Sequence, residues 1–165
     1  STRLDGELLY QIISQRPDYS FVFTGPEDDI FRRDRIHSLK NAYFTGQKKV
    51  DELPAYIAAY DVCINPQMVN KITNGNYPLK IDEYLAMGKP TVATSTHTMR
   101  NIFTGHTHLA INPEEWLAAI DRAVTEADDK ELAKQRIAFA ETHSWGHSVK
   151  KIYEIIDSFL KKKTT

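Results

Sequence analysis

Five short runs of apolar and β-branched residues recur along the chain, and amphipathic or polar stretches separate them. The runs fall near residues 20–24, 42–45, 61–65, 91–94 and 108–111. Strands that alternate with helices pair in parallel, because each helix brings the chain back to the end of the sheet at which the previous strand began. The sequence therefore predicts an α/β fold, a doubly wound parallel sheet with helices on both faces.

Apolar residues at a spacing of three or four predict the helices that connect these strands. We expect helices over residues 5–15, 50–60, 113–124 and 130–140, and a short one over 96–103. A last helix should open at Ser144 and Trp145. It carries one apolar stripe, formed by Val149, Ile152, Tyr153, Ile156 and Phe159.

Composition narrows the class of protein. A length of 165 residues suffices for one domain with a core, and a net charge of −1 argues against a nucleic-acid-binding protein. No apolar run approaches the roughly 20 residues of a membrane span, and no secretory signal is present. The single cysteine, Cys63, fits a buried strand position in a reducing compartment. We therefore expect a cytoplasmic protein, with the Lys161–Lys163 run as a solvated tail after the last helix.

The stretch 74–93 has the pattern of a polar loop, a helix and a buried strand. Asn76 is expected to cap the helix, and Pro78 fits its first turn. Gly88 is expected to end the helix in a left-handed conformation, and the following proline prevents its return.

Lys80 is an unusual residue for the first turn of this helix. A cation at the positive end of the helix dipole is unfavourable by roughly 0.3–1 kcal/mol, unless an anion binds there. The residues alone leave two interpretations open. Lys80 either serves an anion site or forms an exposed ion pair with Glu83, one turn along.

The segment Pro78–Pro90 resembles the donor-site signature of the retaining glycosyltransferases that consist of two facing Rossmann-like domains, the GT-B fold of the group 1 type. It is similar to their C-terminal half, which binds the nucleotide sugar. The resemblance assigns Glu83 to the ribose hydroxyls and Lys80 to the diphosphate. A carboxylate can accept two hydrogen bonds from the ribose diol, and an ammonium with helix N–H groups can stabilise a departing diphosphate.

Gly75 departs from this pattern, because many family members carry a second glutamate there, close to the sugar. That role is then either unfilled or met by the backbone and by Asn74 or Asn76. In the family the turn at Gln47 and Lys48 lies over the nucleotide base. A strand that ends at a glycine and a proline, as at Gly25, is common where ligands approach an α/β sheet, and a plain surface turn fits Gly25 equally well. The candidate donor-binding residues are Lys80, Glu83, Asn76, Tyr77, Pro78, Gly25, Gln47 and Lys48.

The resemblance implies a transferase that moves a hexose-type sugar from a nucleoside diphosphate to an acceptor, in surface polysaccharide synthesis. Residues 1–165 would form one nucleotide-sugar-binding domain of a longer two-domain enzyme. The acceptor and the catalytic groups would belong to an N-terminal domain that is absent here, so this fragment should be inactive. The full enzyme could associate peripherally with a membrane. No cofactor or metal ion is expected, and no Asp-x-Asp motif is present.

In this family a further strand precedes the first helix and lies in the middle of the sheet. If the chain begins after that strand, the sheet is truncated. We then expect the remaining strands to close up in the order 2-1-3-4-5, which is the flavodoxin-like arrangement.

Two other functions fit the same fold. A nucleotide-sugar 2-epimerase shares the two-domain fold and a similar carboxylate, but it works without an acceptor. A non-catalytic flavodoxin-like module, such as a response-regulator receiver, needs an acidic residue at a strand end, where this chain offers Gly25, Gly46 and Asn65.

The histidines form two closely spaced pairs that could suggest a metal site. His106 and His108 would share one face of a strand, and His143 and His147 lie four residues apart. We expect no metal at either pair, because the sequence offers no carboxylate that completes it.

Overall fold

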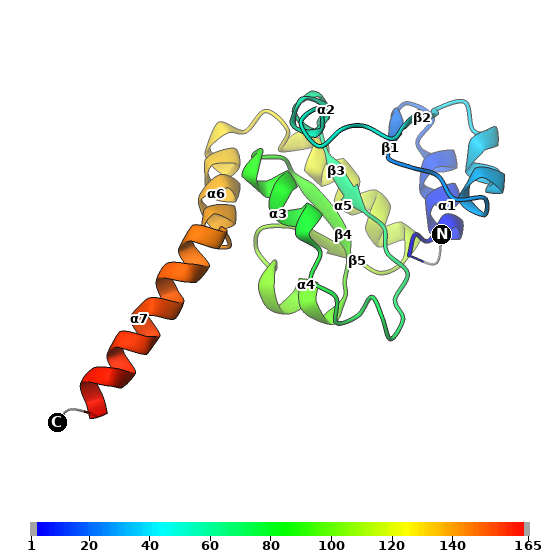
Figure 1. Ribbon diagram of the computed structural model, residues 1–165. Coiled ribbons are helices and arrows are strands. Elements are labelled where there is room, and N and C mark those ends of the chain that lie inside the picture. The colour runs from blue at the N-terminus through cyan, green and yellow to red at the C-terminus, as the bar shows by residue number, and fades with distance from the viewer. Residues whose placement is uncertain (1–2, 164–165) are drawn as a thin grey trace.

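In the computed structural model, which describes residues 3–163, the chain forms an α/β fold whose strand pairs are all parallel (Figure 1). The strands are β1 (Phe21–Thr24), β2 (Ala42–Gly46), β3 (Cys63–Asn65), β4 (Thr91–Thr94) and β5 (His108–Ala110). The predicted fold class is confirmed, and each predicted strand is present at its predicted place.

The strands form two sheets instead of one. β1 pairs with β2, whereas β3, β4 and β5 pair in that order, and no ladder in the described part of the chain joins β1 to β3. The prediction that the strands close up in the order 2-1-3-4-5 is therefore wrong. The reason lies in the core, because Ile12 of the first helix packs in one cluster with Phe21 of β1 and Val92 of β4. The core thus holds both sheets without hydrogen bonds between them.

The helices follow the predicted order. They are α1 (Gly6–Gln15), α2 (Leu53–Ala59), α3 (Leu79–Ala86), α4 (His97–Ile102), α5 (Pro113–Thr125), α6 (Lys130–Glu141) and α7 (Trp145–Lys163). Side-chain caps explain several of their starts, because Asp5 accepts a hydrogen bond from the Leu8 N–H at 3.0 Å and Asn112 accepts one from the Glu115 N–H at 2.9 Å. α2 is shorter than predicted and begins at Leu53.

A charged stretch between β1 and β2 forms two short 3-10 turns, η1 (Phe31–Arg33) and η2 (Arg35–Ser38). Phe31 and Ile36 anchor it, and their exposed fractions are 7% and 0%. Phe31 contributes by stacking edge-on against the rings of Phe23 and Phe44 in the two strands. These contacts hold the stretch against the β1–β2 sheet.

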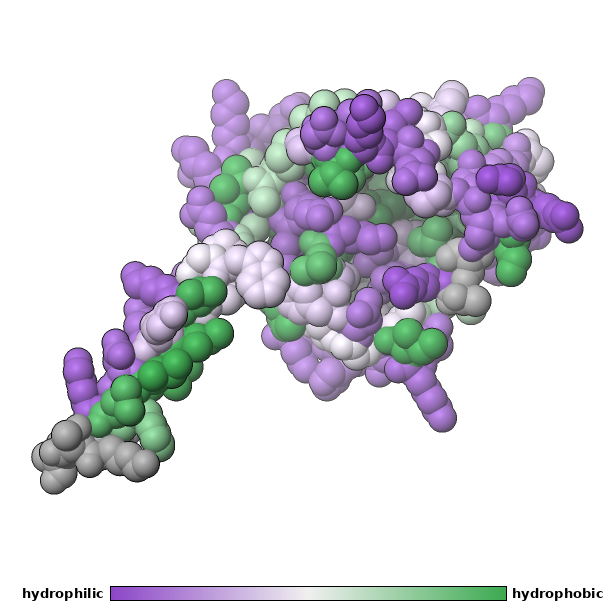
Figure 2. Space-filling model, viewed as in Figure 1, coloured by the Kyte–Doolittle hydropathy of each residue, from purple (hydrophilic) through white to green (hydrophobic). Residues whose placement is uncertain are grey.

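Helix α7 extends away from the body of the molecule (Figure 1). Its apolar side chains gather along one side of the helix, and hydrophilic ones cover the other (Figure 2). The predicted stripe exists but is exposed, since Ile152 is 56% and Phe159 is 62% accessible. The Lys161–Lys163 run lies in the last turn of α7, so the prediction that it follows the helix is wrong. None of the helices in residues 3–163 has the length and apolar character needed to cross a membrane.

Candidate functional site

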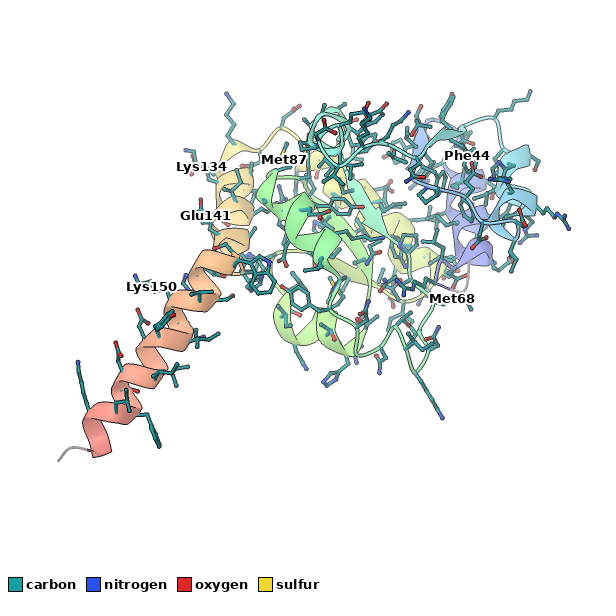
Figure 3. The ribbon with its side chains drawn as sticks, in the orientation of Figure 1. Phe44, Met68, Met87, Lys134, Glu141 and Lys150 are labelled. Carbon is teal, nitrogen blue, oxygen red and sulfur yellow. The ribbon has the colours of Figure 1, made fainter. Side chains whose placement is uncertain are left out.

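The segment before α1 lies against the carboxyl end of β3. The Met68 N–H donates to the Arg3 carbonyl at 2.9 Å, and the Asp5 N–H donates to the Pro66 carbonyl at 3.1 Å. Figure 3 labels Met68 on the long loop that leaves β3. Residues far apart in the sequence therefore meet at this edge of the sheet, where parallel α/β folds bind their ligands.

The loop from β3 to α3 is held by its own polar side chains. Thr73 is 2% exposed, and its hydroxyl accepts a hydrogen bond from the Asn70 N–H at 3.0 Å. The Asn74 side chain accepts one from the N–H of His97, at the start of α4, at 2.9 Å. The loop thus enters α3 from a defined position.

Helix α3 starts later than predicted. Pro78 occupies the capping position without a side-chain hydrogen bond, so the expected cap at Asn76 is wrong. The physical reason is that a residue before proline, here Tyr77, disfavours helical backbone angles, and the helix cannot extend back to Asn76. The end of the helix is as predicted, with Gly88 at a φ of +72°.

Lys80 and Glu83 lie in the first two turns of α3, with both residues exposed to solvent. Although Lys80 as a whole is exposed, nearby protein atoms partly desolvate its ammonium, and this lowers the pKa of that group. The charge of Glu83 raises the pKa of Lys80, and the charge of Arg3 lowers it. Among the described residues no ion pair within 4 Å links Lys80 to Glu83, which leaves the carboxylate and the ammonium available to a ligand.

Arg3 is a candidate site residue that the sequence did not reveal. It lies 77 positions before Lys80, and the hydrogen bond between its carbonyl and the Met68 N–H holds its backbone beside the loop that leads into α3. Two positive charges at the start of a helix favour an anion, because the anion would relieve their repulsion and meet the helix N–H groups.

Gly25 lies at the carboxyl end of β1, beside a hollow of ≈ 450 Å³. The hollow is lined by Leu4, Phe23, Thr24, Gly25, Pro26, Glu27, Asp28 and Phe31. Since Leu4 also pairs with Gln67 in the loop after β3, the carboxyl edges of the two sheets meet at the segment before α1.

The remaining candidate residues fall into two groups, one after β2 and one at the start of α3. Gln47 and Lys48 follow β2, where Gln47 is exposed and the Lys48 ammonium lies 5.2 Å from the ring centre of Tyr56. Asn76 is exposed next to α3, and Pro78 is buried. The structure thus brings Asn76, Tyr77, Pro78, Lys80 and Glu83 together on one loop–helix unit, and leaves Gly25, Gln47 and Lys48 on the other sheet.

Tyr77 has an internal partner. Its hydroxyl donates to the Asp82 carboxylate at 2.6 Å. Burial raises the pKa of Tyr77, and the hydrogen bond to Asp82 adds to the effect. A neutral hydroxyl held in this way serves the shape of the loop, and the sequence did not single out Asp82.

Two histidines have carboxylate partners that the sequence did not indicate. The His108 Nε2 lies 3.1 Å from a Glu126 oxygen, and the His143 Nδ1 lies 2.8 Å from Asp82 Oδ1. Each carboxylate contacts one histidine of its pair, and the prediction that no carboxylate completes a metal site at either pair stays a prediction. Within residues 3–163, no three histidine, cysteine or acidic side chains converge as metal ligands would.

Cys63 is a buried strand residue, as predicted, with an exposed fraction of 4%. Burial raises the pKa of its thiol to about 12. Because the thiolate is the reactive form, this side chain contributes packing and no nucleophile.

Comparison with known proteins gives two findings. The family described as "Glycosyl transferases group 1" matches residues 7–126, which is most of the chain. TuaH of Bacillus subtilis (strain 168), provisionally named as a teichuronic acid biosynthesis glycosyltransferase, is 28% identical over 149 residues. The match covers 87% of this chain but only 37% of the length of that relative.

Proposed function

The chain belongs to the glycosyl transferases group 1 family, and on this basis we propose that it is the donor-binding half of a glycosyltransferase. The complete enzyme transfers a hexose-type sugar from a nucleoside diphosphate to an acceptor in the synthesis of a surface polysaccharide. TuaH supports that setting, because its name refers to teichuronic acid biosynthesis. The reaction proceeds with retention, at the cytoplasmic side, and without a metal ion or another cofactor.

One observation carries the assignment of the donor site. Lys80 and Glu83 lie in the first two turns of the helix that follows β3, and the charge of Arg3 lowers the pKa of Lys80. A nucleoside diphosphate fits both charge types, because its phosphates match the cations and its ribose diol matches a carboxylate.

This arrangement also suggests how the domain assists the transfer. Negative charge develops on the diphosphate as the bond to the sugar breaks. Lys80, Arg3 and the first N–H groups of α3 stabilise that charge in place, which lowers the barrier without a metal ion. The group that attacks the sugar belongs to the acceptor, on the other half of the enzyme.

The break between the two sheets supports the proposal that this is part of a longer enzyme. β1 and β3 each pair on one side alone within the described residues, and a strand between them would complete a single parallel sheet. The exposed apolar stripe of α7 supports it as well, because a stripe of this size needs a covering surface. We assign that surface to the N-terminal half.

Titration calorimetry of the chain with UDP, GDP and their glucose and mannose esters tests the assignment. We expect at least one nucleotide to bind, and Lys80→Ala and Glu83→Ala each to weaken binding by roughly 10- to 100-fold, since charge-assisted hydrogen bonds contribute about 1.5–3 kcal/mol.

A matched control lies on α6, where Lys134 and Glu131 have the same spacing and pair at 2.7 Å on the exposed surface. Lys134→Ala and Glu131→Ala should leave binding unchanged. Equal affinity in the native protein and in both α3 variants would remove the proposed site. Product analysis with the complete enzyme separates transfer to an acceptor from epimerisation of the donor.

A further inference from the structure

Three side chains from separate parts of the chain meet beside the start of α3. The Tyr77 hydroxyl donates to Asp82 Oδ2 at 2.6 Å, while Asp82 Oδ1 lies 2.8 Å from His143 Nδ1. The same imidazole nitrogen lies 3.3 Å from the Tyr77 oxygen. One carboxylate in the first turn of α3 therefore joins the loop before the helix to the segment between α6 and α7.

Aromatic rings hold the imidazole of His143 in this position. Phe139 contacts it edge-on at 4.6 Å between ring centres, and Phe103 does so at 5.8 Å. The ring of Tyr77 also contacts Phe103, with 5.6 Å between the ring centres. The orientation of His143 is thus set by packing, so that its Nδ1 faces the carboxylate.

The link replaces a cap that α3 lacks. Pro78, at the capping position, has no side-chain hydrogen bond, and a proline offers no N–H. The contact from Tyr77 to Asp82 spans this point and ties the loop to the first turn. At its other end the loop is held by Asn74, through the N–H of His97.

We propose that His143 is a positioning residue of the donor site, which acts through Asp82 and Tyr77 to fix the loop 74–78 and the first turn of α3. This inference rests on the proposed function, because the loop and the turn carry the residues assigned to the nucleotide. A further titratable group beside the cluster is His106, whose ring stacks on that of Phe139 with 3.7 Å between the ring centres. Burial lowers the pKa of His106, and the charge of His143 acts in the same direction.

Two substitutions separate hydrogen bonding from packing at this position. The amide nitrogen in His143→Asn can donate from nearly the same place as Nδ1, whereas His143→Leu keeps apolar bulk and has no donor. Exposed His147, four residues further, provides the control His147→Ala. Circular dichroism establishes that each variant is folded, and Tyr77→Phe tests the same link if His143→Leu does not fold.

The first measurement is amide hydrogen exchange of residues 74–80 in the free 165-residue chain. We expect exchange to become roughly ten-fold faster in His143→Leu and Tyr77→Phe, and to stay close to native in His143→Asn and His147→Ala. Equal exchange in His143→Leu and the native chain, or equal acceleration in the Asn and Leu variants, overturns the proposal.

The second measurement is calorimetry with UDP and GDP. If either binds, we expect several-fold weaker binding to His143→Leu, with recovery in His143→Asn. Unchanged affinity in His143→Leu overturns the positioning role and leaves the donor site intact. If the native chain binds neither nucleotide, the proposed function fails, whereas the exchange result still decides whether His143 holds the loop.

Discussion

Gly88, which ends α3, faces Ala133 of α6 without room for a side chain between them. A methyl group added to Gly88 would lie 3.1 Å from the Cβ of Ala133. The φ of Gly88 is +72°, in the left-handed region that favours glycine. Both the backbone angle at this position and the small space beside Ala133 therefore favour glycine. The contact between the two helices fixes the end of α3, which carries Lys80 and Glu83.

We expect Gly88→Ala to lower the free energy of unfolding by about 2 kcal/mol, as a sum of the left-handed backbone and the tight contact. Urea denaturation followed by circular dichroism measures it.

Two other glycines separate these two costs. Gly105 has a φ of +87° and open space around it, so Gly105→Ala should cost only the backbone share, about 1 kcal/mol. Gly75 has neither constraint, and Gly75→Ala should be close to neutral. Equal losses at Gly88 and Gly105 would show that the contact with Ala133 has no energetic weight.

The guanidinium of Arg136 makes a second contact with the end of α3. It is 6% exposed, forms an ion pair with Glu126, and donates to the Gly88 carbonyl at 3.4 Å. Glu126→Gln should therefore destabilise the protein by roughly 2–4 kcal/mol, because it leaves a buried charge without its counter-ion.

The double variant Glu126→Gln with Arg136→Met provides the control for this ion pair. Removal of both charges should recover part of the loss, since two neutral groups need no counter-ion. Strictly additive effects in chemical denaturation would contradict a coupled pair.

The sequence predicted those features that depend on neighbours along the chain. Strand β4, the helix expected over residues 113–124 and the end of α3 at Gly88 all follow from local patterns, and the structure confirms them. The start of α3 was misplaced because the restraint that proline imposes on Tyr77 outweighs the capping tendency of Asn76.

Features that depend on distant residues could not be predicted. Whether β1 joins β3 depends on how two sheets share one core, and no local pattern encodes it. Arg3 reaches the candidate site through a backbone hydrogen bond with Met68, and His143 meets Asp82 across 61 positions. The stripe on α7 was predicted, yet its exposure depends on what surrounds the helix.

Acid should destabilise the fold through His106. The lowered pKa of His106 means that the folded protein binds this proton less readily than the unfolded chain does. The contribution of this group to the free energy of unfolding is therefore fully present above the ordinary histidine pKa of about 6.5, and it is lost as the pH falls below that value.

Urea denaturation at several pH values measures this contribution. Between pH 7.5 and pH 5.5, we expect the free energy of unfolding to fall less in His106→Gln than in the native chain. His147→Gln, on exposed α7, should behave like the native chain, and identical pH profiles for all three would contradict the expectation.

Arg3 should strengthen nucleotide binding mainly through charge. In 50 mM salt, we expect Arg3→Gln to weaken binding roughly five-fold for the nucleotide that the native chain prefers. In 500 mM salt the loss should be smaller, because dissolved ions screen the interaction of an exposed charge with the nucleotide. Calorimetry at the two salt concentrations measures the difference. Arg122→Gln, on the exposed side of α5, removes a charge elsewhere and should change neither value. A loss that is independent of salt would indicate a structural role for Arg3 at the start of α1.

The exposed stripe of α7 should behave differently in the 165-residue chain and in the proposed longer enzyme. In the 165-residue chain Ile152 and Ile156 are 56% and 46% accessible, so a glutamate at either position should change the unfolding free energy by less than about 0.5 kcal/mol. In the complete enzyme the N-terminal half is proposed to cover these residues, and the same substitution then places a charge in an apolar interface. We expect Ile156→Glu to lower the thermal midpoint and the transfer rate of the complete enzyme, with Lys150→Glu on the polar side as the control (Figure 3). Equal effects in both contexts would mean that the stripe stays exposed and that another surface joins the two halves.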